Sequence, residues 1–377
     1  MALWKPTRRE FIATAPTALG AAALPAAAQM LPRSRNLRFL VVGDWGRDGA
    51  HYQKHVARLM AQDAALGGFD FVVSTGDNFY KMGVTSSDDR QWLSSFEHIY
   101  PSSLRSQPWF AVAGNHDWGG NVFAQLDRSG RGGWSMPWLW YDVPGRLWHR
   151  EDVHLFFIDT VVWNAGEDWL YRICGQALRS IDHARQKAWL ERALAASSAA
   201  TKIVFGHHPI FSVAKHGKGL MHMKSLDDIL VANGVSAYVC GHDHCLYHIS
   251  RDKVPGDTMH YVCSGGGSEE LSDYTGDPRA HGCVIPGHCG APNPQWHTYL
   301  DRAGFAVFDV GRDQTRFHFV DRDGRPTEPK TITQRRRTSN GGPLAAPPAN
   351  PASLPEDVNA RATSLLPCTS IARALGL

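Results

Sequence analysis

Five short polar clusters constrain the fold of this chain more than any other feature of its sequence. Each follows an apolar, β-branched or aromatic run, and each carries Asp, Asn, His or Tyr. The clusters span residues 43–46, 76–80, 114–117, 204–207 and 241–244. Turns that follow five strands can gather oxygen and nitrogen donors at one edge of a sheet. A site of that kind suits two metal ions, and paired metals are typical of phosphoryl transfer.

Each cluster alone has a simpler interpretation. Asp44 or Asp77 after a strand can cap a helix or a turn, and the pair Asn115-His116 is more often a turn than a ligand. The five clusters together, in this order, are hard to explain by chance. His242 and His244, two residues apart after an apolar run, form a strong metal-binding pair.

The periodicity predicts strands that alternate with helices early in the chain and become denser later. Helical spacing covers 51–65, and an amphipathic helix over 186–196 places Trp189, Leu190 and Leu194 on one side. The expected strands are 37–42, 69–74, 109–112, 154–158, 202–205, 237–239 and 260–262, with a closing hairpin of 305–310 and 315–320. This order favours a mixed α/β sandwich.

Length and charge narrow the class of protein. The 377 residues suffice for one large domain or two ordinary ones. The formal net charge is +3, and without residues 1–28 it is about +1, so we expect no nucleic acid as a stable partner. After the first thirty positions no apolar stretch reaches the ~20 residues of a membrane span, so we expect no stable membrane insertion.

The N-terminus has the pattern of a twin-arginine export signal. Arg8 and Arg9 precede an Ala-rich apolar stretch, and residues 26–28 form a small-residue cleavage site after Ala28. The alternative is a disordered basic start with a chance Arg pair. Export predicts a periplasmic or secreted protein whose partner during transport is the twin-arginine machinery. We therefore expect a signal peptide (1–28), a catalytic domain (29–334) and a Pro/Ala-rich irregular tail (335–377).

The seven cysteines and two long segments leave alternatives open. Cys283 and Cys289 can pair locally, whereas Cys240 and Cys263 end apolar runs and are expected to be buried. The odd count leaves at least one free thiol, and the sequence does not give the connectivity. Residues 119–149 and 264–299 resemble insertions, which either line the site or only pack as loops.

The motifs resemble those of the calcineurin-like metallophosphoesterases, and among them the small, tartrate-resistant type of purple acid phosphatase. Tyr80, three residues after Asp77, is the discriminating residue, and the stretch 206–212 with 215–217 is similar to the small type in particular. The resemblance covers roughly residues 37–320. It implies an α/β fold, a four-layer α/β/β/α sandwich of two mixed sheets.

The resemblance also implies a ligand set for two metals. Fe(III) would be held by Asp44, Tyr80 and His244; Asp77 would bridge; and a divalent ion, Fe(II), Zn or Mn, would be held by Asn115, His207 and His242. The donor types agree with this division. Carboxylate and phenolate are hard anionic donors that stabilise a trivalent ion, whereas amide and imidazole are neutral donors that suit a divalent one.

Two further histidines, His116 and His216, would lie over the substrate in the resembling family. Imidazole can bind phosphate and protonate a leaving alcohol at mildly acid pH. The alternative interpretations are that His116 only orients a ligand and that His216 is a surface loop residue. Asp117 could hold His116 in place, Asp243 should point away from the metals, and His208 receives no role.

The implied activity is hydrolysis of phosphomonoesters at mildly acid pH. A hydroxide on the metals would attack phosphorus, and His116 with His216 would assist departure of the alcohol. One alternative is a phosphodiesterase or nucleotide hydrolase on the same fold. The other is a non-catalytic exported protein that binds phosphate or metal.

Overall fold

The computed structural model of the chain describes residues 36–163, 183–212, 214, 223–254, 257–270 and 295–333. These residues all belong to one compact unit. The predicted signal peptide (1–28) and tail (335–377) lie outside them, as do His216 and the cysteines 174, 283, 289 and 368. Those expectations therefore stay predictions.

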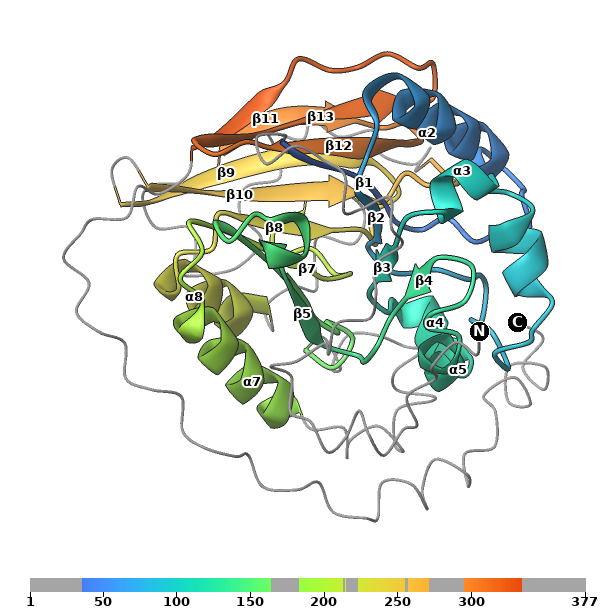
Figure 1. Cartoon of the computed structure of the whole chain (residues 1–377), viewed down its shortest axis with the longest axis horizontal. Coiled ribbons are helices and arrows are strands. Elements are labelled where there is room, and N and C mark those ends of the chain that lie inside the picture. The colour runs from blue at the N-terminus through green and yellow to red at the C-terminus, as the bar shows by residue number, and fades with distance from the viewer. Residues whose placement is uncertain are drawn as a thin grey trace. The chain divides into compact units, whose positions relative to one another are not determined.

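Two mixed sheets form the centre of the described part of the chain (Figure 1). The first has the order β14-β13-β12-β1-β2-β3-β4 and the second the order β11-β9-β10-β8-β7-β6-β5. In the first sheet β1, β2, β3 and β4 run parallel, and in the second β6, β7, β8 and β10 do. The strands are β1 (Leu37–Val42), β2 (Phe71–Ser74), β3 (Trp109–Ala111), β4 (Trp134–Ser135), β5 (Tyr141–Pro144), β6 (Val153–Phe157), β7 (Thr201–Phe205), β8 (Ala237–Cys240), β9 (Leu246–Val254), β10 (Asp257–Ser264), β11 (Gln295–Leu300), β12 (Gly304–Val310), β13 (Gln314–Asp321) and β14 (Lys330–Thr333).

Helices cover the outer faces of both sheets. The helical segments are α2 (Gln53–Gly67), η2 (Trp92–Glu97), α3 (Ser102–Arg105), α4 (Asn115–Gly119), α5 (Val122–Asp127), η3 (Gly145–Trp148), α7 (His183–Ala196) and α8 (Lys224–Ala232). Figure 1 shows α2 beside β1 and β12, and α7 and α8 side by side next to β7 and β8. One apolar core lies between α2 and the first sheet, a second between α7, α8 and the other sheet, and a third between the two sheets. The expected four-layer sandwich is confirmed.

Strand β1 shows why the central strands contain continuous apolar runs, here Phe39–Val42. Leu40 and Val42 pack into the core under α2, whereas Phe39 and Val41 pack between the sheets. Because both faces of a central strand are buried, its sequence has no polar alternation. The two predicted helices follow the 3.6-residue period of an α-helix instead. Trp189, Leu190 and Leu194 are buried on one side of α7 as expected.

The interpretation of residues 119–149 as an insertion is wrong. This segment contains α5, β4, β5 and η3, and it supplies one edge strand to each sheet. Trp134 is 1% exposed within the core that contains Trp45 and Trp109. The Gly- and Pro-rich composition concealed two short strands because edge strands need few apolar residues of their own. Of the second suspected insertion, residues 264–270 and 295–299 are described, and β11 pairs with β9.

The described cysteines follow the prediction. Cys240, Cys245 and Cys263 are free and buried. Their burial as small apolar residues at strand ends agrees with the expectation for Cys240 and Cys263.

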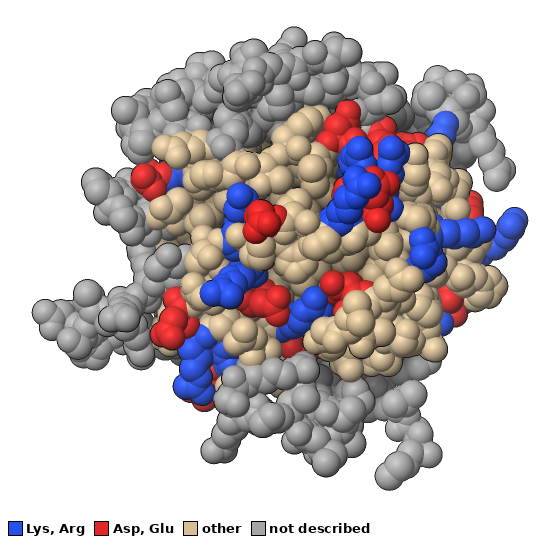
Figure 2. Space-filling model, turned by 90° about the horizontal axis from the view of Figure 1, so that it is seen from above, with Lys and Arg blue, Asp and Glu red and all other residues tan. Residues whose placement is uncertain are grey.

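Surface charges in the described part of the chain form local pairs. Arg302 contacts Asp323 at 2.6 Å, and Lys224 contacts Asp228 at 2.8 Å. Figure 2 shows basic and acidic side chains interspersed on the face it draws. Among the described residues no helix combines the length and the apolar character that crossing a membrane requires.

Candidate metal centre

The loops after β1, β2, β3, β7 and β8 meet between the two sheets. Backbone hydrogen bonds join them in series: Asp44 N–H donates to Gly76 O (3.0 Å), and Gly241 N–H donates to His207 O (3.0 Å). The sheets are linked at this edge because the ring Nδ1 of His207 lies 2.9 Å from Thr75 O. The five clusters that the sequence singled out are therefore neighbours in space.

Three of the predicted ligands surround the phenol oxygen of a fourth, Tyr80. That oxygen lies 3.0 Å from Asp44 Oδ1, 3.0 Å from Asp77 Oδ2 and 3.1 Å from His244 Nε2. A phenol has one proton and cannot donate to three acceptors at once. These donor atoms lie too close together to be held by the available protons alone. Their arrangement is the one expected around a bound cation that they share.

Three other predicted ligands form an adjacent group with neutral donors. Asn115 Oδ1 lies 3.0 Å from His207 Nε2 and 3.1 Å from His242 Nδ1, and the two ring nitrogens are 3.2 Å apart. Asp77 Oδ1 lies 3.4 Å from His207 Nε2. Asp77 thus directs one oxygen to each group, and the structure brings together all seven residues predicted as ligands.

Local backbone geometry turns these side chains inward. Asp44, Asp77 and His242 have positive φ angles of 61°, 48° and 68°, a conformation that costs energy for residues other than glycine. At Gly114 the reason for glycine is close approach, because a Cβ atom there would lie 2.2 Å from Asp77 Oδ1. Strained residues of this kind cluster at functional sites.

The electrostatics of the site also favour a bound cation. Burial and the neighbouring Asp77 raise the pKa of Asp44 well above its ordinary value. Burial and Asp44 likewise raise the pKa of Tyr80. Burial would raise the pKa of Asp77 too, but His207 and His116 lower it to about 2. Anionic groups enclosed together are costly unless positive charge compensates them.

His207 is prepared to act as a neutral donor. Burial lowers the pKa of His207 to about 4, so its ring is neutral at mildly acid pH. The Nδ1–H of that neutral ring donates to Thr75 O, which leaves the lone pair of Nε2 facing Asn115 and Asp77. A backbone carbonyl that fixes the tautomer is the usual outer partner of a ligating histidine.

His116 lies at the rim of the site and is 26% exposed at its side chain. Its backbone N–H donates to Asp77 Oδ1 (2.9 Å), and its ring packs against Tyr80 with centroids 4.5 Å apart. The ring Nδ1 lies 2.6 Å from Lys81 O, and Nε2 lies 3.9 Å from Asp77 Oδ2. One ring nitrogen is therefore anchored on the backbone, and the other faces the ligand groups.

The expectation that Asp117 holds the His116 ring is wrong. The Asp117 carboxylate accepts hydrogen bonds from the backbone N–H groups of Gly114, Asn78 and Phe79 and from Gln125. It binds the loop after β2 to the loop after β3, because buried N–H groups there need acceptors. Asp243 is directed at Ser212 and Tyr247, at 2.6 and 3.0 Å, as expected for a residue that points away from the ligands.

Three residues near the site were missed or left without a role by the sequence. The ligand atoms of His207, His208 and His242 lie within 4.8 Å of one another, and His208 Nδ1 lies 3.0 Å from Thr160 Oγ1. Arg47 stacks on the Tyr80 ring and Glu269 adjoins His244. The sequence could have indicated Arg47, because it follows Asp44 by three residues. It could not have indicated Glu269, which lies in a sixth loop outside the five clusters.

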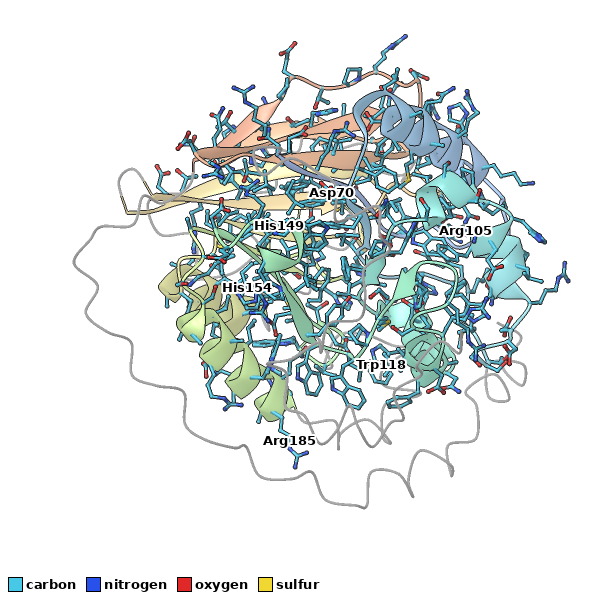
Figure 3. All side chains as sticks on the ribbon, in the orientation of Figure 1. Asp70, Arg105, Trp118, His149, His154 and Arg185 are labelled. Atoms are coloured by element: carbon cyan, nitrogen blue, oxygen red, sulfur yellow. The ribbon has the colours of Figure 1, made fainter. Side chains whose placement is uncertain are left out.

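The loop after β3 is further supported from α4. Trp118 is labelled in Figure 3, and its indole Nε1 donates to Asp159 Oδ2 at 3.0 Å. This bond links the helix that begins at Asn115 to the loop after β6 in the other sheet. The Asn115 and His116 side chains are thus presented by a helix fixed at both ends.

Comparisons with known proteins agree with this site. The model of the family "Calcineurin-like phosphoesterase" matches residues 37–246. Purple acid phosphatase 4 of Arabidopsis thaliana is 39% identical over 244 residues, which are 63% of this chain and 70% of the relative. Tartrate-resistant acid phosphatase type 5 of Rattus norvegicus is 31% identical over 324 residues, which are 83% of this chain and 95% of the relative.

A solved structure is similar in fold. The purple acid phosphatase PPD1 of yellow lupin superposes with a TM-score of 0.53 at 15% identity, covering 80% of this chain and 55% of that one. The two relatives found by sequence carry the names of acid phosphatases, the enzyme class that the motifs predict. Because the family model matches more than half of the chain and the rat relative is matched over nearly its whole length, this chain belongs to the calcineurin-like phosphoesterases and, within them, to the purple acid phosphatases.

Proposed function

We propose that this protein hydrolyses phosphomonoesters at mildly acid pH with one trivalent and one divalent metal, Fe(III) and a divalent Fe, Zn or Mn ion. The observation that carries the proposal is the position of Asp77. Its Oδ2 faces the ligand group with anionic donors, at Tyr80, and its Oδ1 faces the ligand group with neutral donors, at His207. Two adjacent donor sets of different charge suit two ions of different charge.

The residues divide between the two ions as the donor chemistry requires. Asp44, Tyr80 and His244 would hold Fe(III), Asn115, His207 and His242 would hold the divalent ion, and Asp77 would contact both. When bound, such a pair supplies Lewis acidity toward phosphoryl oxygens and lowers the pKa of water. Two carboxylates and one phenolate do not cancel the charge of a trivalent and a divalent ion, so the metal-loaded site would keep a positive charge that favours a phosphate anion as substrate.

His116 is the chain's own candidate for proton delivery. In the protonated ring, Nδ1–H donates to Lys81 O and Nε2–H remains available at the rim of the site. Imidazole titrates in the mildly acid range and transfers protons well there. We assign Nε2 to hold a phosphoryl oxygen or to protonate the departing alcohol, and we propose His216 as its partner.

The decisive experiment combines metal analysis, visible spectroscopy and a pair of substrates. We expect two metals per chain, a purple or pink colour from a Tyr80–Fe(III) charge-transfer band, and faster hydrolysis of an alkyl phosphomonoester than of a matched diester. Tyr80→Phe should lose the colour and weaken iron binding.

Other outcomes would replace the proposal. A colourless wild-type protein with full metal content and phosphatase activity would refute the iron assignment. Preference for the diester would make the protein a phosphodiesterase. A tight stoichiometric complex with inorganic phosphate but no turnover would make it a binding protein.

We also propose that the protein is exported through the twin-arginine pathway to the periplasm or beyond. The support is the order of Arg8-Arg9, apolar stretch and small-residue cleavage site in the sequence. This route transports folded proteins, so the metals would be acquired before export.

A further inference from the structure

A charged side chain covers the face of the Tyr80 ring. The Arg47 guanidinium carbon lies 3.5 Å from the centroid of that ring. Two contacts fix this position: Arg47 Nη2 lies 2.7 Å from Glu269 Oε2, and Arg47 Nε donates to Ser268 Oγ at 3.1 Å. The Arg47 side chain is only 13% exposed, so solvent screens this charge weakly.

The partner of Arg47 also contacts a predicted ligand on the same side. Glu269 Oε2 lies 3.4 Å from the ring Nδ1 of His244, and Glu269 Oε1 lies 3.1 Å from His51 Nε2. The Glu269 carboxylate thus lies between the Arg47 guanidinium and the rings of His244 and His51.

We propose that Arg47 and Glu269 form an outer pair that positions Tyr80 and His244 and sets the electronic character of the iron site with opposite effects. This inference rests on the proposed function, because it concerns the ion that Tyr80 and His244 would hold. A guanidinium over an aromatic face stabilises electron density in the ring, and it does so more strongly for a phenolate. A carboxylate that accepts from Nδ1–H fixes the tautomer and makes Nε2 a stronger donor.

The two predicted metal positions differ in this respect. On the neutral side, the outer nitrogen of His207 contacts a backbone carbonyl, Thr75 O. On the anionic side, the Arg47 guanidinium lies over the Tyr80 ring and the Glu269 carboxylate lies beside the outer nitrogen of His244. A charged neighbour changes the properties of a metal more strongly than a neutral carbonyl does. We therefore expect Arg47 and Glu269 to affect the redox potential of the ion held by Tyr80 and His244.

The test measures the midpoint potential and the visible band of the purified, metal-loaded protein. Arg47→Met removes a positive charge near the iron, so the oxidised form gains relative stability and the potential falls. Glu269→Gln removes a negative charge, so the potential rises. Arg47→Met should also move the charge-transfer band to longer wavelength, because the filled phenolate orbital rises in energy.

Two further variants separate electronic tuning from mere support. Arg47→Lys keeps the charge and should return the potential most of the way to the wild-type value. The double variant Arg47→Met/Glu269→Gln should lie between the two single variants. Arg58→Met, at an exposed position of α2, removes the same charge elsewhere and should change neither measurement.

Each result decides between explanations. Shifts of the same sign in Arg47→Met and Glu269→Gln, or no shift in a coloured protein, would overturn the inference and leave the proposed function intact. A wild-type protein without iron would overturn the proposed function and this inference with it. If Arg47→Met does not fold, Arg47→Lys and Glu269→Gln still test the sign, because only the second should raise the potential.

Discussion

Asp77 is the residue on which the arrangement of the site depends. Its two oxygens contact different groups: Oδ1 accepts the His116 N–H and faces His207, whereas Oδ2 faces Tyr80. His116 shares the backbone contact with Asp77 but directs its ring to the rim. A proposed metal ligand and a proposed substrate-binding residue are thus adjacent, and substitution can tell them apart.

We expect Asp77→Ala to lose metal and activity together, because Asp77 directs one carboxylate oxygen to each group of predicted ligands. His116→Ala should keep both metals and the colour while kcat falls ~10²–10⁴-fold, the usual range for general acid catalysis. The loss should be smaller for aryl phosphates, whose leaving groups need little protonation. Metal analysis beside steady-state kinetics measures both.

The comparison also has a clear opposite result. If His116→Ala loses metal as severely as Asp77→Ala, His116 is a ligand or a structural support. If His116→Ala keeps near-normal rates on alkyl phosphates, proton delivery belongs to His216 or to solvent.

Among the elements, the loops after the parallel strands set the spacing of the ligands. The backbone of the loop after β3 runs against the loop after β2 so closely that Gly114 has no room for a side chain. Asp117 holds the two loops in this contact by accepting N–H groups from both. The distance between ligand groups therefore depends on a residue that makes no ligand contact itself.

Gly114→Ala should reduce metal content strongly while the protein stays folded. The added Cβ would lie 2.2 Å from Asp77 Oδ1 and 2.3 Å from Asp77 N, so Asp77 must move. The control is Gly67→Ala in α2, where the atoms nearest the Cβ all belong to the guanidinium end of Arg38 and none to a predicted ligand. Bound metal per folded chain, measured after circular dichroism confirms folding, should fall in the first variant alone.

Strands β9, β10 and β11 carry a histidine cluster away from the ligand set. His248 Nε2 lies 2.9 Å from His260 Nδ1, and the His248 ring stacks on that of His297 with centroids 4.7 Å apart. Burial and the charges of His260 and His297 lower the pKa of His248 to about 2. An unfolded histidine titrates near ~6.5.

This cluster predicts acid destabilisation of the fold. Below pH ~6.5 the unfolded chain binds a proton at His248 that the folded chain does not. The free energy of unfolding is therefore unaffected by protonation of His248 above that pH and decreases as the pH falls below it. The slope is at most ~1.4 kcal/mol per pH unit for one group. His248→Leu should flatten the dependence of the urea-unfolding free energy between pH 6.5 and 4, whereas His98→Gln, at an exposed position, should not. Equal slopes in all three proteins would contradict this account.

At the scale of the whole molecule, the sandwich brings two sheets to a common edge. The predicted metal ligands come from both sheets, and the Arg47–Ser268 contact joins positions 221 residues apart. A site assembled in this way forms only in the folded protein. This is the physical reason to expect a folded, metal-loaded precursor and an export route that accepts one.

Replacing Arg8 and Arg9 by Lys should leave the precursor in the cytoplasm, because the twin-arginine machinery reads that pair. Fractionation and immunoblotting of the two proteins measure the effect, with phosphatase activity in the cytoplasmic fraction as a check that the retained precursor has folded. Unchanged export of the Lys variant would disprove the assignment of the route.

The sequence alone determined the central strands, the order of the five clusters and the chemical types of the donors. These are local properties: strands buried on both faces, such as β1, have continuous apolar runs, and the polar residues that follow mark the strand ends. The resemblance to a known family then supplied the sandwich and the division of the ligands.

Tertiary structure decided what depends on contacts between distant segments. It placed residues 119–149 in both sheets, assigned Asp117 to the loop backbones and not to His116, and brought Glu269 to His244 and Arg47. No local period records such contacts, because the partners of a loop residue are set by how the sheets pack and not by its neighbours in sequence. The ligand types could be read from the chain, but their mutual distances and their outer charges arise only when the two sheets meet.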